Sequence, residues 1–290
     1  MTASASTRSV QVPSTWALAR VEGRRLVTHP AVLAGVAFGL LFLIINRVAE
    51  SDLPVGFELL RIAPLFLAVG TFIGANLNAL RGRRHGTGEL YEAEPLPARQ
   101  RTAAHLISVL WAVAFAAVLG AIILVTLAVS DGLQVRFVDD IRTRTPTLVE
   151  LALGPLVVGL FGVVGVLLAR WVPSVVVPLL ALVAALPYLM VESWTVAEGP
   201  SGWFTPLWSS ARQLDWVQAT DGDGYSIVAD FAVAALAWHL LFLIGLIVVA
   251  SVLALARHGW TRQLTVGAVI GVGAAVLGAV MQVVAATPWL

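Results

Sequence analysis

The sequence contains no cysteine and no lysine, so all 18 of its basic residues are arginine. The lack of cysteine excludes disulfides, thiolate metal sites and cysteine nucleophiles. The lack of lysine excludes a P-loop ATP site within this chain and Schiff-base chemistry with retinal or pyridoxal phosphate. Charge is also scarce, since only 12% of the 290 residues are charged whereas a soluble domain has about a quarter. With a mean hydropathy of +0.89, the chain is predicted to be a polytopic membrane protein.

Enzyme motifs are absent as well. Neither the His-Glu-x-x-His metal motif nor the Gly-x-Ser-x-Gly nucleophile elbow occurs in the sequence. The glycine run at residues 271–273 lies in an apolar segment with no preceding strand, so it is no dinucleotide fingerprint. Asp221-Gly-Asp223-Gly resembles the opening of a calcium loop but lacks the later ligands, which favours a turn. We therefore expect no catalytic, cofactor or metal residues, and no nucleic-acid partner.

Long uncharged apolar stretches predict an all-α, polytopic helical fold, because a spanning helix needs about 20 such residues. Seven occur, at Ala31–Ile45, Ile62–Leu80, Leu106–Val129, Leu151–Ala169, Trp171–Val191, Phe231–Ala256 and Leu264–Ala286. Pro30 and Asn46 can extend the short first stretch, and the second is expected to begin near Pro54. Because only Arg170 separates the fourth stretch from the fifth, a very tight turn is predicted there.

The distribution of arginine predicts the orientation. If all seven stretches cross the membrane and the N-terminus is cytoplasmic, the inner side holds 12 arginines and 4 acidic residues, a net charge of +8. The outer side then holds 6 arginines and 13 acidic residues, a net charge of −7. Because cytoplasmic loops are enriched in basic residues, this split indicates a cytoplasmic N-terminus, an external C-terminus and a place in the cell inner (cytoplasmic) membrane.

The first 29 residues divide into two expected parts. Residues 1–14 are polar and lack the apolar core of a signal peptide, so a disordered cytoplasmic tail is predicted. Residues 15–29 predict an amphipathic helix on the inner leaflet, with arginines on its polar face. Its apolar face consists of Trp16, Ala19, Gly23, Leu26 and Val27.

The longest cytoplasmic loop is predicted between the second and third stretches, at residues 81–101. Thr87 can cap a short helix, and Glu89 lies in its first turn, where a carboxylate complements the helix dipole. Pro95 disfavours helix at Glu94, so the helix ends there. The alternative is an ordinary solvated loop.

This loop reads Arg-x-Arg-Arg-x-Gly-Thr-x-Glu-Leu, followed by Pro-Leu-Pro-x-Arg, and resembles the cytoplasmic loop of type-2 ABC exporter permeases. Residues 21–30 resemble that family's interfacial helix running into its first span. The resemblance covers about fifty residues directly and implies six spans in residues 30–256, with a coupling helix that docks on a separate P-loop ATPase subunit. The implied partners are that ATPase, a second permease subunit (homo- or heterodimer) and membrane lipid. The implied ATPase contacts are Arg84, Thr87, Glu89, Leu90, Tyr91 and Arg99.

The last stretch departs from the six-span family pattern. Residues 264–286 are uncharged and contain Gly267-x-x-x-Gly271, a spacing that lets helices pack closely. They form either an additional C-terminal span or a membrane-immersed hairpin. In the large outer loop, residues 192–229, four tryptophans are typical of a membrane interface, and the resemblance implies short re-entrant helices.

Ionisable residues at membrane depth are few. Glu58 and Arg61 are three residues apart, so they can pair on one helix face near the outer end of their span. His239 lies about eight residues into the sixth stretch, where a polar residue is a functional candidate by default. The alternative is a histidine that bonds to a neighbouring helix. Three functions follow as hypotheses: an ABC exporter permease, an ion-coupled secondary transporter or non-catalytic assembly subunit, and an intramembrane enzyme.

Overall fold

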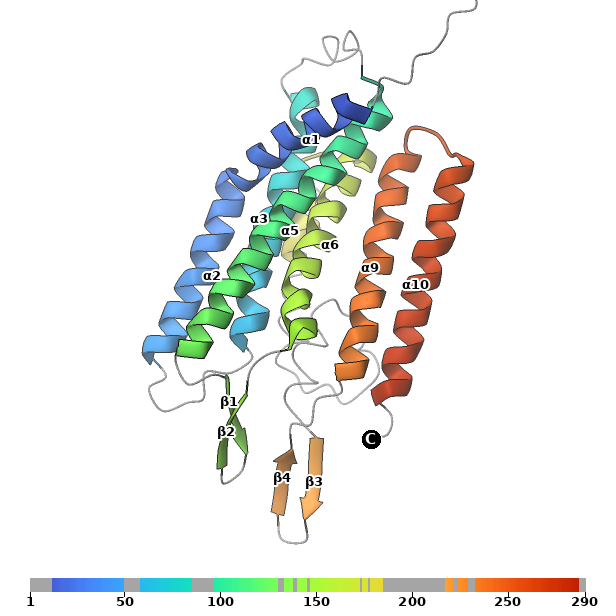
Figure 1. Cartoon of the computed structure of the whole chain (residues 1–290). Helices are drawn as coiled ribbons and strands as arrows, with labels where there is room; N and C mark the ends of the chain where they lie inside the picture. The colour runs from blue at the N-terminus through green and yellow to red at the C-terminus, as the bar shows by residue number, and fades with distance from the viewer. Residues whose placement is uncertain are drawn as a thin grey trace, which may run out of the picture.

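Long helices dominate the computed structural model of the chain (Figure 1). It describes residues 12–49, 58–84, 96–129, 133–137, 140–144, 147–172, 174–176, 178–184, 217–221, 224–228 and 233–286. Within these residues, five helices are long and apolar enough to cross a membrane, and a bent pair of helices raises the number to six if it forms one span. The protein is therefore a multi-pass helical membrane protein.

The bent pair consists of α1 (Val12–Val27) and α2 (Pro30–Ala49). Their axes differ by 49° across a break at Thr28 and His29. α1 begins at Val12, so residues 12–14 are helical and do not belong to the tail expected at residues 1–14. Pro13 is compatible with this helix because proline is tolerated in the first turn. α2 begins at Pro30 and extends past Asn46, as expected of the first apolar stretch.

The remaining candidate spans coincide with five of the apolar stretches. They are α3 (Glu58–Arg84), α5 (Ala98–Val129), α6 (Leu148–Trp171), α9 (Val233–Ala256) and α10 (Arg262–Ala286). The last expected span thus forms one continuous helix through the described residues, rather than a hairpin. In Figure 1, α10 descends beside α9 and ends at the opposite end of the bundle from α1.

The break between the fourth and fifth stretches lies directly after Trp171 and not at Arg170. α6 continues through Arg170 to Trp171, where an arginine in the last turn complements the helix dipole. The helix stops at Val172, whose extended backbone is the conformation that a following proline favours. In the fifth apolar stretch, residues 178–184 are helical, and residues 185–191 lie outside the described part.

Two short hairpins that the sequence analysis did not anticipate supplement the helices. β1 (Leu133–Phe137) pairs antiparallel with β2 (Asp140–Arg144) between α5 and α6. β3 (Val217–Asp221) pairs with β4 (Gly224–Val228) before α9, so Asp221 lies opposite Gly224 across a two-residue connection. The turn expected at residues 221–224 is confirmed. Both hairpins lie beyond the end of the bundle that is opposite α1 (Figure 1).

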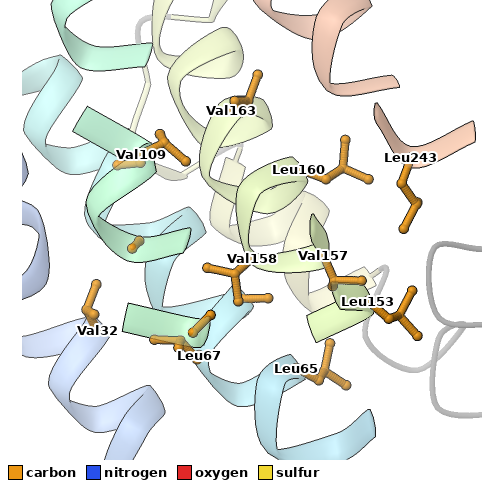
Figure 2. Packing of buried hydrophobic residues seen from close by; sticks show 14 of the residues in the cluster. Val32, Leu65, Leu67, Val109, Leu153, Val157, Val158, Leu160, Val163 and Leu243 are labelled. Atoms are coloured by element: carbon orange, nitrogen blue, oxygen red, sulfur yellow. The ribbon is translucent and has the colours of Figure 1, made fainter. Parts of the chain in front are cut away.

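The core forms where α2, α3, α5, α6 and α9 meet. Figure 2 shows buried valine and leucine side chains from these helices, among them Val32, Leu67, Val109, Val158 and Leu243. α3 packs against both α2 and α6, and α6 also packs against α5 and α9. These two helices therefore form the centre of the bundle.

Glycines allow the central helices to approach closely. A Cβ atom at Gly35 of α2 would lie 2.5 Å from the Phe66 carbonyl oxygen, and one at Gly70 of α3 would overlap the Ala31 carbonyl oxygen. A Cβ atom at Gly165 of α6 would lie 2.5 Å from the Phe72 carbonyl oxygen. Since lipid tails are as apolar as the helices, this close backbone packing is a main source of association in a bilayer.

α9 and α10 form a second closely packed unit. A Cβ atom at Gly271 would lie 2.9 Å from Val248, and one at Gly278 would overlap backbone atoms of α9. On the α9 side, a Cβ atom at Gly245 would overlap the backbone of Ala275. The close approach expected from Gly267-x-x-x-Gly271 is therefore confirmed, although the contact extends well beyond these two residues.

Candidate functional site at the arginine-rich end

One end of the bundle gathers most arginines of the described residues. α1, the end of α3, the start of α5, the end of α6 and the α9–α10 loop meet there (Figure 1). We call it the arginine-rich end; its arginines are Arg20, Arg24, Arg25, Arg81, Arg83, Arg84, Arg99, Arg101, Arg170, Arg257 and Arg262. Together with Arg8, which lies outside the described residues, they are the 12 arginines that the seven-span topology assigns to the cytoplasmic side.

α1 is docked on the start of α5. Ala19 and Leu26 are buried, and a Cβ atom at Gly23 would overlap the indole of Trp111. The ring of Trp16 meets Trp111 edge to face, with 6.0 Å between ring centroids. The apolar face predicted for α1 therefore packs at least partly on protein. Arg20 and Arg24 remain exposed on other sides of the helix, and contact with lipid stays a prediction.

Glu22 lies on the docked face of α1 and is buried. Its carboxylate accepts a 2.7 Å hydrogen bond from the guanidinium of Arg25, one turn later. This pairing offsets the cost of burying the carboxylate. It also explains how an acidic residue can occupy the helix face that packs on α5.

The α1–α2 break is organised by His29. Its Nδ1 atom accepts a 3.2 Å hydrogen bond from the backbone N–H of Ala31, so the imidazole caps the start of α2. A Cβ atom at Gly74 would lie 3.4 Å from the ring, which places His29 against α3. Burial lowers the pKa of His29 below its ordinary value, which favours the neutral ring that the cap requires.

Two side-chain hydrogen bonds tie the α9–α10 loop to the start of α5. Arg99 donates to the Thr261 hydroxyl at 3.1 Å, and the Thr102 hydroxyl lies 2.9 Å from Nε2 of His258. Thr102 is fully buried. The loop turns at Gly259, whose φ of +107° is a conformation that glycine adopts readily. A third bond runs from the Trp171 indole at the end of α6 to the Leu253 carbonyl of α9, at 2.9 Å.

The expected ATPase contacts are placed only in part. Thr87, Glu89, Leu90 and Tyr91 lie outside the described residues, as does the whole expected coupling helix. Arg84 is the last residue of α3, and Arg99 is the second residue of α5. The helices on either side of the segment are therefore described: α3 ends at the arginine-rich end, and α5 begins there.

Polar residues on α3 were missed by the sequence analysis. The amide of Asn76 is buried and donates a 3.0 Å hydrogen bond to the Gly165 carbonyl of α6. Among the described residues, Thr71 Oγ1 and Asn78 Nδ2 are buried without a hydrogen-bond partner. The signal was available, because these three residues interrupt the apolar stretch 62–80. Such groups inside a membrane are expensive and are typical of functional positions.

His239 is fully buried between α9 and α10. Its Nδ1 atom lies 2.8 Å from Oε1 of Gln282, and its ring packs against Phe242 with 5.6 Å between centroids. The alternative of a histidine that bonds to a neighbouring helix is thus the one observed. Gln282 is the polar interruption of residues 264–286 that could have indicated this pair.

The other intramembrane candidates, Glu58 and Arg61, lie in the first turn of α3. Their side chains are outside the described part, so their pairing stays a prediction. Within the described ranges, no group of three or more histidine, aspartate or glutamate residues is arranged to hold a metal ion.

The comparisons with known proteins give no relative: no family model, no curated protein and no solved structure matches this chain. Any function must therefore be argued from the residues themselves and from the resemblance of residues 21–30 and 81–101.

Proposed function

We propose that the chain is the membrane-spanning permease subunit of an ABC exporter. It would move a substrate across the cytoplasmic membrane with ATP hydrolysed by a separate nucleotide-binding subunit. The observation that carries the proposal is the segment at residues 81–101. It resembles the coupling loop of type-2 exporters in a chain that has no lysine, and hence no P-loop ATP site of its own.

The packing around this segment supports the proposal. α3 enters the segment from the centre of the bundle, where it packs against α2 and α6. α5 leaves it toward α1 and α6. A force applied to the segment would therefore reach most of the bundle through two long helices, as coupling to a partner ATPase requires. The implied contacts are Arg84, Thr87, Glu89, Leu90, Tyr91 and Arg99.

The proposed orientation places the arginine-rich end in the cytoplasm, by the excess of arginine over acidic residues there. We expect seven crossings, with the C-terminus outside. Reporter fusions after Leu290 and after Arg257 measure this directly: the first should report an external location and the second a cytoplasmic one. A cytoplasmic signal after Leu290 would contradict the seven-span topology.

Co-purification tests the function itself. The chain, tagged and extracted in mild detergent from the cells that encode it, should bring down a P-loop ATPase, in a complex of two membrane and two nucleotide-binding subunits. A neighbouring reading frame is expected to encode a soluble protein with Gly-x-x-x-x-Gly-Lys-Ser/Thr. Recovery of an active transporter that contains this chain alone and runs on a proton or sodium gradient would reject the proposal.

The second candidate is an ion-coupled secondary transporter, and the buried His239–Gln282 pair is the observation that favours it. Proton-coupled carriers usually rely on a carboxylate relay near the midplane. The apolar stretches that form α5, α9 and α10 contain no acidic residue. The exporter proposal therefore explains more features of the chain than the secondary-transporter alternative does.

A further inference from the structure

The α9–α10 loop is bonded to the start of α5 by residues far apart in sequence. The Arg99–Thr261 bond spans 162 positions, and the Thr102–His258 bond spans 156. We call these four residues the latch. Thr102 is buried and His258 is exposed, so the bond between them is partly buried.

The α9–α10 hairpin, to which the latch is bonded, is held together by its own contacts. α10 packs on α9 along its length, through Gly271 and Gly278, and His239 bonds to Gln282 between the two helices. α9 in turn packs on α6. The latch adds a direct polar link from this unit to α5, at the arginine-rich end.

The α5 end of the latch directly follows the segment at residues 85–95. The carbonyl of Pro97 accepts hydrogen bonds from the backbone N–H groups of Gln100 and Arg101, at 2.9 and 3.1 Å, and so fixes the start of α5. Arg99 and Thr102 lie in the first turns after Pro97. A displacement of the preceding segment would thus act on these two residues first.

We propose that the latch transmits movement from the ATPase-contacting segment to the α9–α10 hairpin. In this role Thr102, Thr261 and His258 are positioning residues that make the α9–α10 hairpin follow the start of α5. The inference rests on the proposed function. It adds a route through residues outside the family's six-span pattern, and it gives the seventh helix a part in transport.

The test compares coupling in the assembled complex, using variants that spare Arg99 because Arg99 is also an expected ATPase contact. The double variant Thr102→Val/Thr261→Val keeps side-chain shape and removes both hydroxyls. The variant loses both bonds of the latch, together with the local bonds from the Thr102 hydroxyl to the Ala98 carbonyl and from the Leu264 N–H to the Thr261 hydroxyl. We expect transport per ATP hydrolysed to fall about tenfold. Co-purification of the ATPase should be unchanged. Thr102→Ser/Thr261→Ser retains the hydroxyls and should retain normal coupling.

A matched control lies in the same loop. The Thr265 hydroxyl accepts a hydrogen bond from the Trp260 indole at 2.8 Å and donates one to the Thr261 carbonyl at 3.4 Å, and both bonds are local to the hairpin. Thr265→Val should therefore leave transport per ATP unchanged. The ratio of transport to ATP hydrolysis also distinguishes a loss of coupling from a loss of folded protein, since a loss of folded protein lowers both quantities together.

The last part of the experiment replaces the Thr102–His258 bond with a chemical cross-link. The chain has no cysteine, so Thr102→Cys/His258→Cys introduces the only two thiols. A short bifunctional thiol reagent should link them and restore coupling that the substitutions reduced. Normal coupling in Thr102→Val/Thr261→Val and in Thr102→Cys/His258→Cys without the reagent would overturn the latch, even if the ATPase co-purifies. Failure of the unmodified chain to bind any ATPase would overturn the proposed function, and the latch with it.

Discussion

Gly70→Leu is expected to prevent the native packing of α2 on α3. Even a Cβ atom at this position would overlap the carbonyl oxygen of Ala31 and lie 3.1 Å from Cα of Val32. These are backbone atoms and have no rotamer by which to move away. Overpacking of a well-packed core costs about 1–3 kcal/mol, and we expect the upper end of that range or more here. The measurement is the midpoint of thermal unfolding in detergent, with the yield of monodisperse protein as a second readout.

Gly120→Leu provides the control for this prediction. Gly120 lies inside a long helix, as Gly70 does, but a Cβ atom there meets no other atom within 4 Å. Leucine also has a better helix propensity than glycine, so the control should be neutral or slightly stabilising. Equal unfolding midpoints for the two variants would contradict the close α2–α3 contact.

Much of the helical frame was predictable because each spanning helix needs a long run of apolar residues. α2, α9 and α10 begin within two residues of the apolar stretches that predicted them. The break between the fourth and fifth stretches was predicted two residues too early because a charge was taken as the end of a span. An arginine in the last turn is favourable there, and the true end is set by Val172 before Pro173.

The hairpins were missed although a signal for one of them was present. Residues 133–137 read Leu-Gln-Val-Arg-Phe, a clean alternation of apolar and polar side chains that is typical of a strand. A search for stretches of about 20 apolar residues passes over a five-residue alternation. Strand register also depends on the partner β2, and a single short segment does not specify that partner.

The candidate site was predictable only in its local parts. Polar interruptions of apolar runs, such as Asn76 and Gln282, can be recognised in the sequence, but their partners Gly165 and His239 follow only from how the helices pack. The same holds for Thr102 and His258, since no sequence pattern relates residues 156 positions apart. Arginine counts locate this end of the bundle, but they do not indicate which side chains meet there.

The double change Glu89→Lys/Tyr91→Ala is expected to abolish transport while leaving membrane insertion normal. Glu89 lies in the first turn of the predicted coupling helix, among Arg81, Arg83 and Arg84. Reversal of its charge costs about 0.3–1 kcal/mol of interaction with the helix dipole. Loss of a partly buried ion pair with the partner would cost about 2–5 kcal/mol more.

Tyr91 supplies the apolar part of the same expected contact, since aromatic anchors often dominate small interfaces. Together the two changes should remove ATPase association, as measured by co-purification, and transport with it. Glu94→Lys is the matched control. It makes the same change in charge at the other end of the predicted helix, where a lysine complements the dipole, so association should persist. Full transport by Glu89→Lys/Tyr91→Ala would mean that residues 81–101 form a solvated connector, and the coupling assignment would then be wrong.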